Sequence, residues 1–179
     1  TPHQITYPYP DDLIDFDPSS PNAAYNWELF FHVPFFIAVR LMQNERFEEA
    51  LGYLQMIFDP TSPGPGTDRA WQFLPFRAKT AGSVVDMLTR LEHGTLSNAE
   101  TSVVASQLAA YRDEPFNPHL IARLRPTAYM RAVVMRYLDC LIGWGDQLFG
   151  RLTLESLNQA TLMYITAAKL LGHRPTTLP

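Results

Sequence analysis

The amino-acid sequence predicts an all-α fold: an irregular bundle of about six to seven helices, containing αα-hairpins and following an extended, proline-rich N-terminal arm. Apolar residues recur at helical spacing in several long segments. Start and stop signals for helices separate these segments, and nothing in the pattern requires a strand. With 179 residues, of which 46% are hydrophobic, and a mean hydropathy of −0.11, the chain can form one domain with a core.

Residues 1–24 form the expected arm, ahead of a single helical domain at residues 25–172 and a proline-rich tail at residues 173–179. The arm holds five prolines and four aspartates, a composition that disfavours a helix. The aspartates, between Asp11 and Asp17, could form a calcium loop, but the ligand order of an EF-hand and its closing Glu are missing. We interpret this segment as a docking arm.

Two helices are expected after the arm, at residues 25–44 and 46–58. The first is predicted to be kinked or broken near Pro34, because proline removes a backbone donor. It is almost entirely apolar from Leu29 to Met42, so we expect other elements to cover most of its sides. The second carries one apolar stripe and ends at Asp59-Pro60, before a loop rich in proline and glycine.

Further start and stop signals divide the middle of the chain. A helix at about residues 80–91 is expected to end at Gly94. The next begins at Ser97, whose side chain and that of Glu100 can cap each other's backbone donors. Asn117-Pro118 predicts a short helix that runs to about residue 124.

Two long helices are expected at the C-terminal end. Pro126 opens a central helix predicted at residues 127–149, and Thr153 caps a final helix that ends at Leu171, with Gly172 as its left-handed stop. Arg136, Asp139 and Asp146 are predicted to face outward on the central helix. The residues predicted to face inward are Met130, Val134, Tyr137, Leu138, Leu141, Trp144, Gly145 and Leu148 in the central helix and Leu154, Leu157, Thr161, Tyr164 and Ala168 in the final helix.

The two glycines beside Trp144 are predicted to differ. Gly145 lies in the apolar stripe, so a larger residue there should clash with a partner helix. Gly143 is expected to face outward and to accept Ala.

Composition argues against several classes of partner and crosslink. Lys and Arg number 14 and Asp and Glu 18, a net charge of −4 that favours neither nucleic acid nor an anionic membrane. Cys140 is the one cysteine, so we expect neither an intrachain disulfide nor a zinc site built from cysteine pairs. No apolar run approaches the roughly 20 residues of a membrane span. Because the chain begins Thr1-Pro2-His3, without an initiator Met or a leader, we expect it to be cut from a longer protein.

Glu28 and His32 are the best candidates for a metal or acid–base site, because residues four apart lie on one face of a helix. No further ligand is identifiable, so we favour a structural His32 that packs beside Phe31 and Phe35. His119 follows a helix start without a nearby nucleophile, and capping or packing is the simpler role. We therefore expect no catalytic, cofactor-binding or metal-binding residues and no cofactor.

The sequence also lacks common catalytic motifs. No serine lies in a G-x-S-x-G setting, and neither Gly64–Gly66 nor Gly143–Gly145 is followed by the Gly-Lys-Ser/Thr of a phosphate loop. A series of aromatic residues could line a ligand pocket or a sugar-binding platform, but core packing is the favoured interpretation. The series comprises Phe30, Phe31, Phe35, Phe36, Trp71, Phe73 and Phe76.

Several separate motifs point to one protein family. They are Tyr25–Pro34 (YNWELFFHVP) followed by Phe58–Thr61 (FDPT), Phe73–Phe76 (FLPF), Pro115–His119 (PFNPH) with Ala122-Arg123, Tyr137–Asp139 (YLD) before Trp144–Asp146 (WGD), and Gly172–Pro175 (GHRP). In this order they resemble the insecticidal toxin complex (Tc toxin) A subunit, from residue 25 to residue 175. The chain departs from the family pattern at Gly52–Leu54, Cys140 and Gly143, where aromatic, Asn and Ala residues are expected, and these changes affect packing.

The resemblance implies that this chain is a helical segment from the C-terminal half of a very large, secreted bacterial toxin. Such a toxin forms a bell-shaped homopentamer, in which a helical shell surrounds a pore-forming channel that injects a toxic enzyme carried by other subunits. The implied partners are the remainder of the parent chain, the other protomers and, through the full-length protein, the toxin B and C subunits. Nucleic acid is not among them, and the segment itself does not span the membrane.

Our functional interpretation is therefore a non-enzymatic assembly segment of this shell. One alternative is a self-standing metal-dependent hydrolase that uses Glu28, His32 and His119, which would have to converge on one cleft. Another is a peptide-binding helical module with a groove lined by Tyr53, Tyr111 and Tyr129. For the assembly segment, we expect the isolated chain to expose apolar surface that the parent chain covers.

Overall fold

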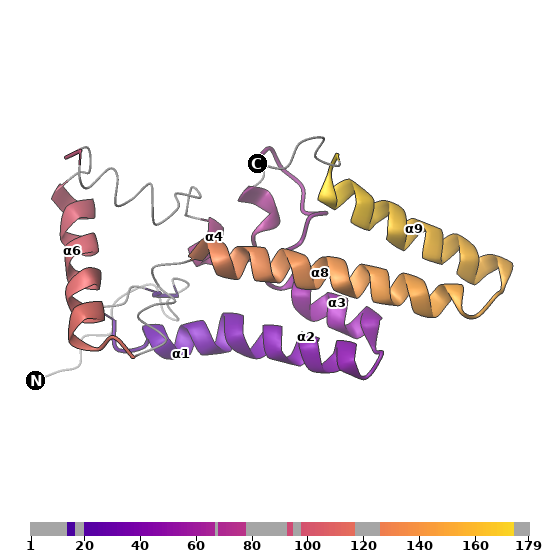
Figure 1. Cartoon of the computed structure of the whole chain (residues 1–179), viewed down its shortest axis with the longest axis horizontal. Helices are drawn as coiled ribbons and strands as arrows, with labels where there is room; N and C mark the ends of the chain where they lie inside the picture. Colours follow the sequence, from indigo (N-terminus) through magenta and orange to yellow (C-terminus); the bar gives the residue numbers. More distant parts are fainter. Residues whose placement is uncertain are drawn as a thin grey trace, which may run out of the picture.

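A computed structural model describes residues 14–16, 20–66, 68–77, 93–94, 98–116 and 126–173. Within these ranges the chain is all-α, as predicted, apart from one isolated antiparallel bridge between Phe58 and Trp71 (Figure 1). The helical elements are α1 (Ala23–Trp27), η1 (a π-helical turn, Glu28–His32), α2 (Val33–Gln43), α3 (Phe47–Gln55), η2 (a 3₁₀ turn, Asp68–Ala70), α4 (Leu74–Arg77), α6 (Asn98–Asp113), α8 (Pro126–Phe149) and α9 (Leu154–Leu171).

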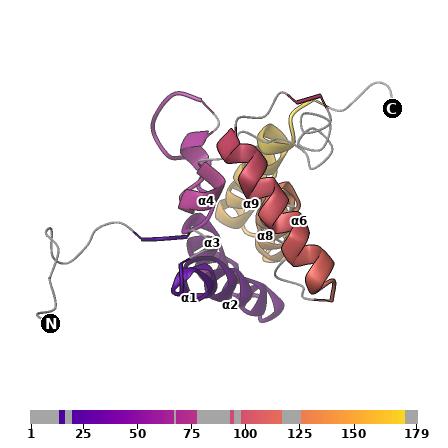
Figure 2. The ribbon, with the colours of Figure 1, turned by 90° about the vertical axis from the view of Figure 1, so that its left-hand side faces the viewer.

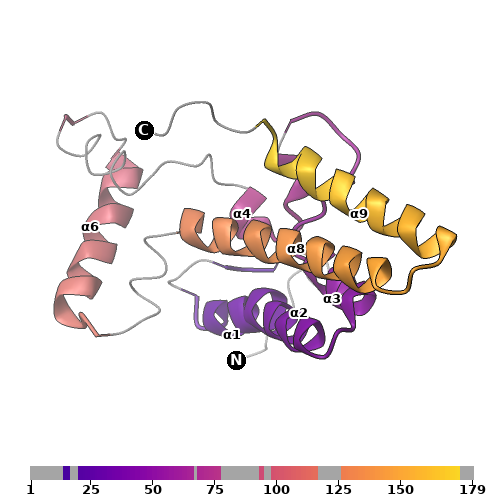
Figure 3. The same cartoon turned by 45° about the vertical axis from the view of Figure 1, so that its right-hand side comes forward.

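Two αα-hairpins form the body of the fold. α2 pairs with α3, and α8 pairs with α9. α8 lies between α9 on one side and the α2–α3 hairpin on the other (Figure 3). α6 stands near the end of the molecule at which α8 begins, and its axis is steeply inclined to that of α8 (Figures 1 and 2). The predicted hairpins are thus confirmed.

The π-helical turn η1 joins α1 to α2 just before Pro34. Pro34 has no N–H for the carbonyl four residues earlier, and its ring would clash with that carbonyl in a regular α-helix. The chain widens into a π turn instead, so that α1, η1 and α2 continue as one helical segment from Ala23 to Gln43. The interruption predicted near Pro34 therefore takes the form of a π turn, and the helix begins earlier than the predicted Tyr25.

α3 is shorter than predicted, because it ends at Gln55 and not at Phe58. The chain then turns back on itself, and the Asp59 N–H donates to the Ala70 carbonyl at 2.7 Å. The Asp59 carboxylate accepts hydrogen bonds from the backbone N–H and the hydroxyl of Thr61, at 2.9 and 2.6 Å. Asp59 thus organises the loop that follows α3.

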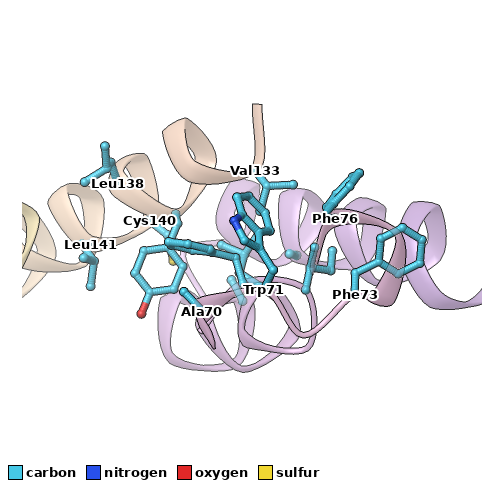
Figure 4. Close-up of a cluster of buried hydrophobic side chains, with 14 of the residues drawn as sticks. Ala70, Trp71, Phe73, Phe76, Val133, Leu138, Cys140 and Leu141 are labelled. Carbon is cyan, nitrogen blue, oxygen red and sulfur yellow. The ribbon is translucent and has the colours of Figure 1, made fainter. Parts of the chain in front are cut away.

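The core lies between α3, the loop after it and α8 (Figure 4). The Trp71 ring centroid is 4.8 Å from that of Phe58 and 5.4 Å from that of Phe76. Phe58 in turn meets the Tyr137 ring of α8 edge-on at 5.6 Å. Rings from the loop therefore fill the space between two helices that are distant in the sequence.

α8 follows the prediction closely, in both its bounds and its inward face. Arg136, Asp139 and Asp146 are exposed, as predicted. Val133 and Cys140 are fully buried although the predicted face omits them, because α3 and the Trp71 loop extend the covered arc of the helix. The residues of the predicted face that are buried are Tyr137, Leu138, Leu141, Gly145 and Leu148.

Thr153 caps α9, as predicted. The Thr153 hydroxyl accepts a hydrogen bond from the Ser156 N–H at 3.2 Å, and the Ser156 hydroxyl accepts one from the Thr153 N–H at the same distance. The helix ends before Gly172, whose φ of +74° is in the range that favours glycine.

The predicted inward face of α9 is partly wrong, although Leu157 and Tyr164 are half-buried and Tyr164 packs against Gly145 of α8. Leu154, Thr161 and Ala168 are exposed, whereas Ser156, Ala160 and Ala167 are buried. Small residues on the buried face allow α9 to approach α8 closely, and this packing prevails over the stripe of larger residues that the periodicity favoured. Leu154, Thr161 and Ala168 are consequently left toward solvent.

Several predicted boundaries fall partly or wholly outside the described residues. α6 begins at Asn98, as the capping signal predicts, but Ser97 itself lies outside the described ranges. Gly94 has the expected positive φ, +63°. The helices predicted at residues 80–91 and 117–124 also lie outside the described residues.

Gly143 does not face outward, contrary to the prediction. A Cβ atom on Gly143 would lie 2.8 Å from Cε1 of Phe47, because α3 packs against that side of α8. A Cβ atom on Gly145 would lie 2.7 Å from Cε1 of Tyr164, so this glycine does meet a partner helix, α9. Both glycines therefore make room for an aromatic ring.

Gly143→Ala and Gly145→Ala should both destabilise the fold. Overpacking costs about 1–3 kcal/mol and the gain in helix propensity returns up to about 1 kcal/mol, so we expect a net loss of about 1 kcal/mol for each variant. Denaturant-induced unfolding measures this loss. Gly52→Ala is the matched control, because no atom lies within 4 Å of its added Cβ, and it should stabilise α3. A Gly143→Ala variant that is stabilised like Gly52→Ala would contradict this packing.

Candidate functional site

The two residues weighed as an acid–base pair, Glu28 and His32, are the first and last residues of η1. Glu28 is exposed at the start of η1. The His32 ring packs edge-on against Phe31 at 4.9 Å and Tyr129 at 6.0 Å. His119 lies outside the described residues, and within the described ranges no three His, Cys, Asp or Glu residues are grouped as metal ligands. The geometry thus gives His32 an aromatic packing role.

Cys140 is held as a thiol rather than as a nucleophile. It is fully buried, and its Sγ donates to the Phe47 carbonyl at 3.4 Å. Burial raises its pKa from 9.0 to about 11, because the thiolate would lose its hydration. The thiol joins α8 to the start of α3 and is neutral at physiological pH.

The three tyrosines of the predicted peptide groove do not share one surface feature. Tyr53 and Tyr129 pack against the core, and Tyr129 meets Phe31 edge-on at 5.4 Å. Tyr111 is exposed on α6. A groove of about 570 Å³ in the described structure is lined by other residues: Glu45, Arg46, Phe47, Glu48, Glu49, Trp144, Gln147, Leu148, Arg151, Gln159 and Met163.

Most of the residues that line the groove are polar, and an ion pair neutralises two of its charges. Arg46 forms an ion pair with Glu49, and both side chains are about half exposed. The Gln147 side-chain N–H donates to the Glu45 carbonyl at 3.1 Å, which ties the α2–α3 turn to α8. The described contacts at this end of the molecule therefore connect the two hairpins.

The aromatic series divides between core and surface. Phe31, Trp71, Phe73 and Phe76 are buried, which agrees with the core-packing interpretation. Phe30 and Phe36 are exposed, by 38% and 58%. The Arg40 guanidinium lies over the Phe36 ring, 5.2 Å from its centroid, and covers part of it.

An apolar stripe runs along α1, η1 and α2. Tyr25, Leu29, Val33 and Phe36 are exposed by 75%, 60%, 44% and 58%, and we call these four residues the α1–α2 stripe. Their spacing of four, four and three residues places them along one side of the helical segment.

The α1–α2 stripe corrects the expectation that other elements cover most of this helix. Its opposite side is buried, at Phe31, Pro34 and Ala38. Sequence reasoning recognised that the helix is apolar on most sides but did not separate the two sides. The signal is present in the spacing, because two apolar stripes run in parallel along the same helix.

No helix in the described ranges is both long and apolar enough to cross a membrane.

No established family profile matches this chain. The toxin subunit YenA2 of Yersinia entomophaga is 28% identical over 164 residues, which cover 92% of this chain and 10% of that protein. The solved structure of TcdA4 from Morganella morganii matches with a TM-score of 0.62 at 28% identity, over 92% of this chain and 6% of TcdA4. The TcaA-TcaB structure from Yersinia pseudotuberculosis matches with a TM-score of 0.57 at 26% identity, over 86% of this chain and 7% of the matched chain.

These similarities confirm the resemblance that the motifs predict: the chain is similar to a segment of Tc toxin A subunits in both sequence and fold. The chain spans a tenth or less of the length of these relatives.

Because His32 is held by neighbouring rings, the purified chain should carry no stoichiometric metal. His32→Gln should leave the metal content unchanged, as measured by inductively coupled plasma mass spectrometry. Glu28→Gln serves as the second variant, since the two residues would be ligands together. One zinc per molecule in the wild type, lost in both variants while they stay folded, would restore the hydrolase alternative.

Proposed function

We propose that this chain is a structural assembly segment in the helical shell of a pore-forming, toxin-translocating Tc toxin A subunit, without catalysis of its own. The α1–α2 stripe is the observation that carries this proposal. A helix that is apolar on two opposite sides is suited to burial between neighbouring elements, and only one of its sides is covered within the described structure.

The free energy of burying apolar side chains favours a partner that packs against the α1–α2 stripe. Fully burying a Val, Leu or Phe side chain contributes roughly 1.5–3 kcal/mol relative to leaving it in water. Leu29, Val33 and Phe36 each leave a large fraction of that contribution unrealised in the isolated chain. A partner that covers them would thus gain several kcal/mol from this one helix.

The remainder of a longer toxin chain is the partner that we favour. Because each relative is at least ten times longer than the part that this chain matches, most of such a protein lies outside the matched segment. The homopentamer, the secreted location and the link to toxin B and C subunits belong to that proposed full-length protein.

Two packing contacts support the part of this proposal that assigns no catalysis to the segment. The best acid–base candidate, His32, packs between Phe31 and Tyr129, and the buried Cys140 is held as a thiol. We assign these residues to packing, and the delivered activity to other subunits of the complex.

Val33→Ser and Phe36→Ser test the proposed role of the stripe. Both side chains are exposed, so the free energy of unfolding of each isolated variant should lie within about 0.5 kcal/mol of the wild-type value. In the full-length toxin, the double variant should reduce the yield of assembled or secreted protein, while each assembled particle delivers enzyme of unchanged catalytic potency. Native gel electrophoresis and a secretion assay measure the yield.

Met56→Ser is the matched control, because Met56 is exposed by 59% but lies at the end of α3, outside the stripe. The full-length Met56→Ser toxin should give the same yield of assembled and secreted protein as the wild type. Full assembly of the Val33→Ser, Phe36→Ser toxin would defeat the proposal.

A further inference from the structure

We propose that Trp27, Phe30 and Phe73 form a recognition site for a short peptide segment with one aromatic residue, and that residues 14–16 of this chain are its occupant. We call Trp27, Phe30 and Phe73 the three-ring site. Residues 14–16 are bound there as a ligand, so they can leave without unfolding the helical body. The three-ring site is separate from the α1–α2 stripe, and its role does not depend on the proposed shell.

Phe16 is the aromatic anchor of the bound segment. Its ring centroid lies 5.1 Å from that of Phe73, 6.2 Å from that of Phe30 and 6.4 Å from that of Trp27. The planes of the rings are inclined by 78°, 76° and 84°, so all three contacts are edge-on, a geometry that aromatic pairs prefer. Phe16 is partly buried by these rings.

Asn26 holds the backbone of the segment beside the anchor. Its side-chain N–H donates to the Asp15 carbonyl at 2.6 Å. Asn26 precedes Phe30 by four residues, so the two side chains lie on one side of the helical segment and contact adjacent residues of the arm. Peptide-binding sites commonly combine these two elements, because hydrogen bonds to the main chain hold the peptide and a site for one side chain provides specificity.

Contacts that do not involve residues 14–16 fix the three-ring site. The ring centroids of Trp27 and Phe73 are 4.9 Å apart. The Phe73 ring lies 5.4 Å from Phe31 and 5.0 Å from Phe76, both of which are buried in the core. Phe30 directly precedes Phe31 in η1. We therefore expect the site to keep its shape when Phe16 leaves, as in ligand sites that are largely pre-formed.

The bound segment lies at the surface of the molecule. Phe30 is exposed by 38% although the Phe16 ring contacts it, and Ile14 is exposed by 40%. Residues 14–16 belong to no helix or strand, so their departure breaks no helical hydrogen bond. A free peptide can consequently reach the site once Phe16 has vacated it.

Denaturant-induced unfolding of the 179-residue chain tests whether residues 14–16 are a ligand or a part of the core. Phe16→Ala should keep a single cooperative transition with an unchanged slope, because the slope follows the surface exposed on unfolding and the helical body stays intact. Phe73→Ala, which truncates a buried ring of the site, is the control and should lower the midpoint at least twice as much. A Phe16→Ala chain that is as destabilised as Phe73→Ala, or that has no cooperative transition, would overturn the inference.

Binding of a separate peptide is the second test. A capped peptide with the sequence of residues 12–17 is added to the ¹⁵N-labelled Phe16→Ala chain. The nuclear magnetic resonance signal of the Trp27 indole N–H reports on the site, and Trp27→Phe assigns this signal. We expect a saturable shift of the signal toward its wild-type position, because the phenylalanine of the peptide restores the missing ring.

Two controls accompany the peptide. The same peptide with alanine in place of its phenylalanine should leave the Trp27 signal where it is. The Trp144 indole signal should not move with either peptide, since Trp144 lines the groove near the end of α8, far along this helix from the Tyr129 that contacts Phe31.

The wild-type chain shows whether its own Phe16 occupies the site. A segment tethered by a short linker has an effective concentration in the millimolar range, and it competes with the free peptide. The wild type should therefore need several-fold more peptide than Phe16→Ala for the same shift of the Trp27 signal. An equal response of the two chains, or no saturable shift in Phe16→Ala, would overturn the inference.

Discussion

The aromatic cluster around Phe31 is the interaction on which the rest of the fold depends, because it joins segments that are far apart in the sequence. The Phe31 ring of η1 lies 5.4 Å from Phe73, 5.1 Å from Phe76 and 5.4 Å from Tyr129 at the start of α8. Phe16 of the N-terminal arm meets Phe73 at 5.1 Å, which anchors the described part of the arm. Each such aromatic contact contributes about 0.5–1.5 kcal/mol beyond its buried area. The cluster fixes the first helical segment against α8, and the α2–α3 and α8–α9 hairpins are positioned from there.

This arrangement also determines which apolar surfaces remain open. The first helical segment turns Phe31 and Ala38 inward, so its other apolar side, the α1–α2 stripe, faces away from the core. On α8, Met135, Ile142 and Phe149 are also exposed. The two sets of exposed residues belong to different helices. The fold therefore leaves apolar side chains of more than one helix for other parts of a larger protein to cover, as we propose for a segment of the shell.

The sequence predicted elements better than it predicted which of their sides are buried. Periodicity and caps located α8 and α9, because a proline start and a Thr153 cap act through local backbone geometry. The prediction of the buried side of α9 was partly wrong, because the small residues Ala160 and Ala167 occupy that side, and the hydrophobicity of one helix does not reveal a close approach of two helices. The prediction that Gly143 faces outward was wrong for a similar reason. The Phe47 ring that packs against Gly143 comes from a helix nearly one hundred residues earlier in the sequence. For the candidate surfaces, the apolar residues were recognisable, but their exposure depends on contacts that only the tertiary structure supplies.

The central claim is that the isolated chain folds on its own core yet displays apolar surface that a larger protein covers. Sedimentation velocity across a range of protein concentrations, with binding of a hydrophobic fluorescent dye measured on the same samples, tests this claim most directly. We predict concentration-dependent self-association and dye binding by a chain that still unfolds cooperatively. A cooperatively folded chain that stays monomeric at every concentration and binds no dye would contradict the account.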